Sequence, residues 1–271
     1  MTPSFESAGW FARHAAIARQ FVRIGVIRKA QFRMEFVNQV VMDCAFYATH
    51  IMAFEFLYRF TDSIAGWSRA EVRVFLGCLF VGDAFAMVWL GQCWLFGEDL
   101  KKGNLDTVRV RPASPIVLYF FQRFSLEGLT NFAIAASYLA YALFSAGLLA
   151  SPWTIPLTVW AVLLAFWART VLTVFYSTSE LWVLNSDLSR YAHNFFMEVT
   201  DRPIAVFHTR FQQFLSYVVP AAAMTYVPAS IVTGRLGALG ALAYTAFLAV
   251  FGLAVFRLWR ASFRRYESGM G

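Results

Sequence analysis

The sequence predicts an all-α integral membrane protein with six transmembrane helices. Of its 271 residues, 59% are hydrophobic and only 14% are charged, whereas about a quarter of the residues in an ordinary soluble domain are charged. The chain also contains long uncharged stretches, and a membrane-spanning helix needs roughly 20 apolar residues. A chain with this composition has no room for a large soluble catalytic domain.

The six predicted spans follow one another with short connections. Residues 128–168 carry no charge and are interrupted in the middle by Ser151 and Pro152, which indicates two spans joined by a turn. The first span is the least apolar, because it contains Asp43, His50 and Glu55; we expect Glu55 to pair with Arg59 four residues later. The expected spans are residues 36–59, 73–96, 124–149, 153–177, 206–230 and 235–257.

The distribution of basic residues predicts the orientation of the chain. Most of the 23 lysines and arginines flank the spans on one side, and basic residues are retained on the cytoplasmic side of membrane proteins. We therefore expect both termini in the cytoplasm. The net charge of +7 is explained by the basic residues that set this orientation. We expect membrane lipids to be partners of this chain, and we do not expect it to bind nucleic acid.

Two further segments are expected to lie at the membrane surface within one transmembrane domain over residues 1–271. Residues 1–34 form a basic amphipathic pattern with Trp10 and Phe21 on its apolar face. Residues 178–205 mix aromatic and charged side chains and predict a second, cytoplasmic interfacial segment. The three cysteines lie in apolar stretches and indicate packing.

The sequence lacks the motifs of several enzyme classes. It contains no G-x-x-x-x-G-K-[ST] phosphate-binding loop, no H-E-x-x-H zinc motif and no G-x-S-x-G nucleophile motif. Its four histidines are too scattered to suggest a metal site. We predict no catalytic residue, no metal site and no cofactor on this chain.

Ionisable side chains inside the spans are candidates for function. Asp43 and Asp83 either line a translocation path or form structural pairs, for example Asp43 with Arg169 or with a hydroxyl of a neighbouring helix, since a carboxylate in a bilayer needs a partner or water. Arg169 is expected to extend toward the cytoplasmic headgroups. Pro220 and Pro228 belong to the same candidate path, and we expect them to bend or end the fifth span near the outer surface.

The segment 97–123 after the second span is the most distinctive loop. It contains a glycine break, a short helical stretch with one acid and two arginines, and two prolines that stop the helix. Such a compact charged element suits docking against another protein, although a well-capped loop explains it equally well. The residues that define it are Gly103, Leu105, Asp106, Arg109, Arg111, Pro112 and Pro115.

This loop resembles that of the permease subunits of ATP-binding-cassette exporters of the type-two class, a six-span bacterial family. The resemblance rests on Gly103-x-Leu105-Asp106 followed by a basic residue and Pro112-x-x-Pro115. Further similar positions are Phe166-Trp167, Pro203, Val219-Pro220 and the run from Tyr226 to Ala229. The sequence departs from the family pattern at Arg109, where a leucine is expected.

The resemblance implies a permease of the bacterial inner membrane that exports its substrate by alternating access. It implies two separate ATP-binding subunits carrying ATP and Mg²⁺, a second permease copy or paralogue, and a coupling role for the loop residues named above. The alternative is a multispan membrane enzyme or scaffold acting on lipids, with Asp43, Asp83 and Arg169 as its site. This alternative gives the loop at 103–115 no role. Neither hypothesis identifies the substrate.

Overall fold

The computed structural model describes residues 19–20, 22–24, 27, 33–91, 93–109, 114–120, 124–183 and 188–266. The N-terminal interfacial helix expected over 1–34 falls almost entirely outside this part of the chain. The long helices are α2 (Arg33–Leu57), α3 (Arg69–Leu90), α7 (Leu126–Ser145), α8 (Thr154–Glu180), α9 (Leu188–Thr200) and α12 (Ala238–Arg265). An all-α membrane architecture is thus confirmed.

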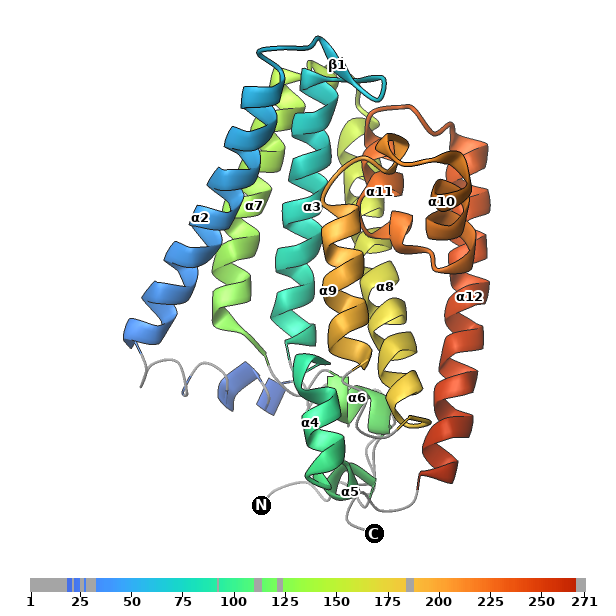
Figure 1. Ribbon diagram of the computed structural model, residues 1–271. Coiled ribbons are helices and arrows are strands. Elements are labelled where there is room, and N and C mark those ends of the chain that lie inside the picture. Colours follow the sequence, from blue (N-terminus) through green and yellow to red (C-terminus); the bar gives the residue numbers. More distant parts are fainter. Residues whose placement is uncertain are drawn as a thin grey trace.

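By length and composition, five of these helices could cross a membrane. They are α2 from Phe36 onward, α3, α7, α8 and α12, and they lie side by side (Figure 1). At one end, which we call the hairpin end, α2 and α3 are joined through the strands β1 (Ser63–Ile64) and β2 (Trp67–Ser68). At the other, the loop end, lie α4 (Phe96–Lys101), α5 (Asn104–Arg109) and α6 (Pro115–Phe120).

Helices α3 and α7 approach each other closely because glycines lie between them. A Cβ atom on Gly77 would stand 2.7 Å from the side chain of Leu139, and one on Gly128 would stand 2.7 Å from the backbone nitrogen of Val88. The start of α7 is fixed there as well, since the backbone N–H of Ser125 donates to the carbonyl of Val88 at 3.0 Å. The pair α3–α7 therefore forms a rigid core of the bundle.

At the hairpin end, one arginine connects two parts of the chain. Arg235 precedes α12 and donates to both carboxylate oxygens of Glu71 in α3, at 2.7 and 3.0 Å, and also to the carbonyl of Gly66. Its guanidinium lies 4.6 Å from the ring centre of the fully buried Trp67. The contact with Glu71 raises the pKa of Arg235. We call this group of residues the outer clasp.

Replacing Arg235 by alanine is expected to lower the free energy of unfolding by about 1 kcal/mol. The exposed ion pair contributes little, because solvent screens it, and the contact with the Trp67 ring adds a comparable amount. Thermal unfolding of the purified protein measures the effect. Arg59→Ala removes an exposed arginine at the same end and serves as the control; equal effects of both variants would contradict a specific role of the outer clasp.

One sequence-based expectation at this end was wrong. Glu55 does not pair with Arg59: it accepts from the Nε atoms of Arg69 at 2.7 Å and of Arg73 at 2.6 Å. Both partners lie on α3, across the hairpin. The tight hairpin turn, with positive φ angles at Ala65 and Gly66, brings the start of α3 beside the end of α2.

The helix expected over 206–230 is not continuous. The chain forms η3 (Ile204–Val206), α10 (Thr209–Gln213), the π-helical η4 (Phe214–Val218), the 3₁₀ helix η5 (Ala221–Met224) and α11 (Tyr226–Val232). Pro220 stands at the break between η4 and η5, as its fixed φ and missing N–H require. Pro228 lies in the first turn of α11 and does not end a helix.

The segment 178–205, expected to be interfacial, contains α9, which packs along α8. The rings of Phe196 on α9 and Tyr176 on α8 are stacked at 5.4 Å, and both side chains are buried. Helix α9 runs toward the hairpin end, where α10 and α11 lie (Figure 1). Arg210 in α10, which was expected on the cytoplasmic side, therefore belongs to the half of the bundle nearer the hairpin end.

Candidate functional site

The loop between α3 and α7 folds into the three short helices α4, α5 and α6. Gly103 separates α4 from α5 with a φ of +68°, a left-handed conformation that glycine adopts without strain. Pro115 begins α6, where its missing N–H leaves no hydrogen bond unmade. These two residues of the predicted set thus shape the loop.

Buried apolar side chains attach the loop to the bundle. Leu105 is 1% exposed and Val108 is 4% exposed, and both belong to one cluster with Phe96, Phe120 and Trp259 of α12. The ring centres of Phe120 and Trp259 are 5.2 Å apart. Because α5 turns its apolar residues inward, its position is fixed relative to α12.

Two side-chain hydrogen bonds to one carboxylate hold the three short helices together. The carboxylate of Asp99 accepts from the side-chain amide of Asn104 and from the hydroxyl of Tyr119, each at 2.8 Å. Asp99 thereby connects α4 with both α5 and α6. None of Asp99, Asn104 and Tyr119 was predicted as a site residue from the sequence; only the spacing of Asp99 and Asn104 across the glycine break gave a local signal.

The remaining predicted loop residues fall into two groups. Asp106 lies in the first turn of α5 and is half-buried. Arg111, Pro112 and the side chain of Arg109 lie outside the described residues. Exposed side chains in the described part of the loop include Glu98, Lys101, Lys102, Asn104 and Thr107, and the Nζ of Lys102 lies 3.1 Å from the carboxylate of Glu98.

Within the bundle, Asp43 of α2 is paired with an amide. Its carboxylate accepts from the fully buried Asn131 of α7 and, at 3.1 Å, from Gln39 one turn earlier. The predicted partners, Arg169 or a hydroxyl, are not the ones observed. The contact joins α2 to α7. Nearby, the Nε2 atom of His50 is 3.7 Å from the carboxylate of Asp201, which joins α2 to the end of α9.

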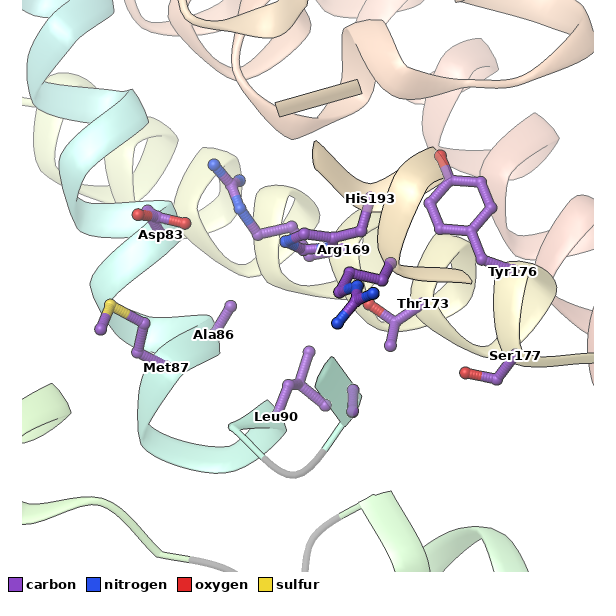
Figure 2. A pocket seen from close by; sticks show the side chains of 11 residues that line it. Asp83, Ala86, Met87, Leu90, Arg169, Thr173, Tyr176, Ser177 and His193 are labelled. Carbon is purple, nitrogen blue, oxygen red and sulfur yellow. The ribbon is translucent and has the colours of Figure 1, made fainter. Parts of the chain in front are cut away.

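Asp83 and Arg169 line one cavity between α3, α8 and α9 (Figure 2). Arg169 is only 3% exposed, so it does not extend to the headgroups as expected. One of its terminal nitrogens, Nη1, donates to the carbonyl of Met224 at the end of η5. Space for the guanidinium comes from Gly82, where a Cβ would stand 2.7 Å from Nη1.

The contact between Arg169 and Met224 explains how the broken segment is accommodated. Irregular backbone within a membrane protein persists only where protein or water satisfies its polar groups. The carbonyl of Met224 stands where η5 ends, and the buried arginine supplies its donor. Arg169 therefore links α8 to the segment that Pro220 interrupts.

Arg190 and His193 of α9 and the hydroxyl-bearing residues Thr173, Tyr176 and Ser177 of α8 also line this cavity. Of the predicted path residues, Asp83 lies in the cavity, whereas Asp43, Pro220 and Pro228 do not line it. No group of three or more histidine, cysteine, aspartate or glutamate side chains in the described part of the chain could hold a metal ion.

Comparison with known proteins identifies one family. The family model of ABC-2 family transporter proteins matches residues 44–269. No curated protein and no solved structure matches the chain. The matched range contains the loop, the cavity and the broken segment.

Proposed function

The chain belongs to the ABC-2 family of transporter proteins and is a membrane permease component, and from this premise we propose that it exports its substrate using ATP hydrolysed on separate subunits. Two ATPase subunits with bound ATP and Mg²⁺ would dock beneath a pair of permeases, formed with a second copy or a paralogue. The complex would reside in the bacterial inner membrane, with both termini of this chain and its loop end in the cytoplasm.

The observation that carries this proposal is the construction of the α4–α6 loop. Its apolar side is anchored on Trp259 through Leu105 and Val108, and Asp99 fixes the three helices relative to one another. A movement imposed on its exposed side would therefore be transmitted to α3 and α12 rather than absorbed by the loop. A coupling element needs this combination of a free surface and a rigid attachment.

We propose that α9 and the segment 204–232 together form the fifth crossing. The support is the packing of α9 along α8 and the position of α10 and α11 near the hairpin end (Figure 1). ATP binding would tilt α2, α3 and this crossing between two orientations. A nucleotide shifts such an equilibrium only by its different affinities for the two states.

Charge reversal in the loop tests the coupling role. Arg111→Glu is expected to leave membrane insertion and ATP hydrolysis intact while transport falls at least about tenfold, a change worth roughly 1.4 kcal/mol of coupling free energy. The measurement compares ATPase activity with substrate release in the reconstituted complex. Arg260→Glu makes the same charge change on an exposed residue of α12 and is the control.

Co-purification tests the assembly itself. A tagged permease extracted in a mild detergent should carry an ATP-binding subunit with it. If none accompanies the chain, and if Arg111→Glu leaves activity unchanged, the proposed function is wrong. Loss of membrane insertion in Arg111→Glu would instead identify this arginine as a topological anchor.

A further inference from the structure

A surface pocket lies at the hairpin end of the bundle, between the end of α2 and the start of α3; we call it the hairpin pocket. Its volume of about 400 Å³ falls within the roughly 300 to 1,000 Å³ of ligand-binding pockets. Its lining consists of Met52, Glu55, Phe56, Arg59 and Arg69. All of these except the half-buried Glu55 are exposed, so a ligand can reach them from outside the bundle.

The positive charge in and around the hairpin pocket is only partly neutralised. Glu55 is the one acid of the lining, and it accepts from the Nε atoms of both Arg69 and Arg73, at 2.7 and 2.6 Å. The side chain of Arg59 forms no hydrogen bond or ion pair with any described residue. The hairpin's Asp62 does not line the pocket. Three arginines therefore face one carboxylate, which leaves two positive charges in excess.

Apolar side chains adjoin these charges on the side toward the middle of the bundle. Met52, Phe56 and Arg59 follow one another at spacings of four and three, which places them on one face of a helical segment. Because α2 runs toward the hairpin end (Figure 1), Met52 lies about 10 Å deeper than Arg59 at 1.5 Å per residue. The exposed ring of Phe60 contacts Phe56 at 5.1 Å. The pocket is thus cationic at its outer rim and apolar below.

We propose that the hairpin pocket binds the headgroup of an anionic phospholipid. Arg59 would donate to two phosphate oxygens, as a guanidinium does in a bidentate contact. Arg69 would add its Nη1, which Glu55 leaves unused, and the upper part of an acyl chain would cover Met52 and Phe56. A lipid with net negative charge is favoured over phosphatidylcholine, because the ammonium group of phosphatidylcholine cancels its phosphate and leaves the excess positive charge of the pocket uncompensated.

Photo-crosslinking of the full-length chain in nanodiscs tests the proposal. Benzoylphenylalanine replaces Phe56 in the pocket, or Phe60 beside it in a second variant that leaves the lining unchanged. The reference position is the exposed Phe144 at the end of α7, which also lies at the hairpin end. The nanodiscs contain phosphatidylcholine with a minor share of phosphatidylglycerol, and mass spectrometry gives the ratio of attached phosphatidylglycerol to phosphatidylcholine. We expect this ratio to be about fivefold higher at the pocket than at position 144.

Substitution of single arginines locates the site. Arg59→Gln removes the charge of an exposed side chain that has no partner among the described residues, so the fold should persist while the ratio at the pocket falls to nearly that at position 144. Arg210→Gln is the matched control, since Arg210 is an exposed arginine of α10 in the same half of the bundle and does not line the pocket. We expect it to leave the ratio unchanged.

Three results would overturn the proposal. Equal lipid ratios at the pocket and at position 144 would show that no anionic lipid is selected there. Equal losses in Arg59→Gln and Arg210→Gln would show that phosphatidylglycerol responds only to overall charge. Loss of the enrichment with inorganic phosphate, but not with chloride at equal ionic strength, would assign the pocket to a soluble anion. None of these measurements requires an ATPase subunit, so their outcome is independent of the proposed transport function.

Discussion

Replacing Gly128 by leucine is expected to lower the free energy of unfolding by about 3 kcal/mol or more, or to prevent accumulation of the protein. A Cβ on Gly128 would stand 2.7 Å from the backbone nitrogen of Val88 and 3.0 Å from the carbonyl carbon of Met87. Overpacking of a core typically costs about 1 to 3 kcal/mol when side chains can adjust. Here the obstacle is backbone, so α3 and α7 would have to separate.

The expected loss of stability in Gly128→Leu is measured by thermal unfolding in detergent. Gly91→Ala is the matched control, since Gly91 lies three residues beyond Val88 and a Cβ there would stand 3.6 Å from its nearest neighbour. Its helical φ of −59° suits alanine, which should be neutral or slightly stabilising. Equal stability of the two variants would show that α3 and α7 are not in close contact at this point.

Hydropathy predicted the five long apolar helices well because each contains its own apolar window. It indicated no span at α9, for which the sequence predicted an interfacial segment; this helix has only 13 residues and includes Arg190, His193 and Glu198. Helix α9 is accommodated by its neighbours: Phe196 stacks on Tyr176 of α8. A short helix shielded in this way is defined by tertiary contacts, which a single-sequence window does not contain.

The break in the segment 206–230 could be predicted from the sequence. The hydrogen bond that satisfies the backbone near this break could not. Pro220 lacks an N–H and has a fixed φ, so a break at this position follows from local chemistry. The donor that satisfies the carbonyl of Met224 comes from Arg169, which is 55 positions away in the chain. Its predicted extension to the headgroups was wrong because that expectation treated α8 as an isolated helix.

In the candidate site, too, residues with local roles could be predicted from the sequence, whereas residues defined by distant contacts could not. Gly103 and Pro115 could be recognised because a turn and a helix start place local demands on residue type. Asp99 could not be recognised as the centre of the loop, since its partner Tyr119 is 20 positions away. Likewise, Asp43 was identified as a residue that needs a partner, but the choice of Asn131 depends on how α2 packs against α7.

Replacing Leu105 by alanine is expected to disconnect ATP hydrolysis from transport. Leu105 is 1% exposed and packs with Phe96 and Trp259 beneath the loop. Removing a buried leucine side chain costs about 2 to 5 kcal/mol, and a short surface element is less stable than the whole domain. Helix α5 should therefore detach locally while the bundle stays folded.

Reconstituted complexes measure this effect. In Leu105→Ala we expect ATPase activity to persist and transport to fall by about tenfold or more, because a movement of the ATPase subunits would no longer reach α12. Thr107→Ala, an exposed residue of the same helix, should leave both activities close to wild type. Transport at the wild-type rate in Leu105→Ala would show that the buried attachment of α5 does not transmit the movement, and coupling would then have to pass through a different surface of the permease.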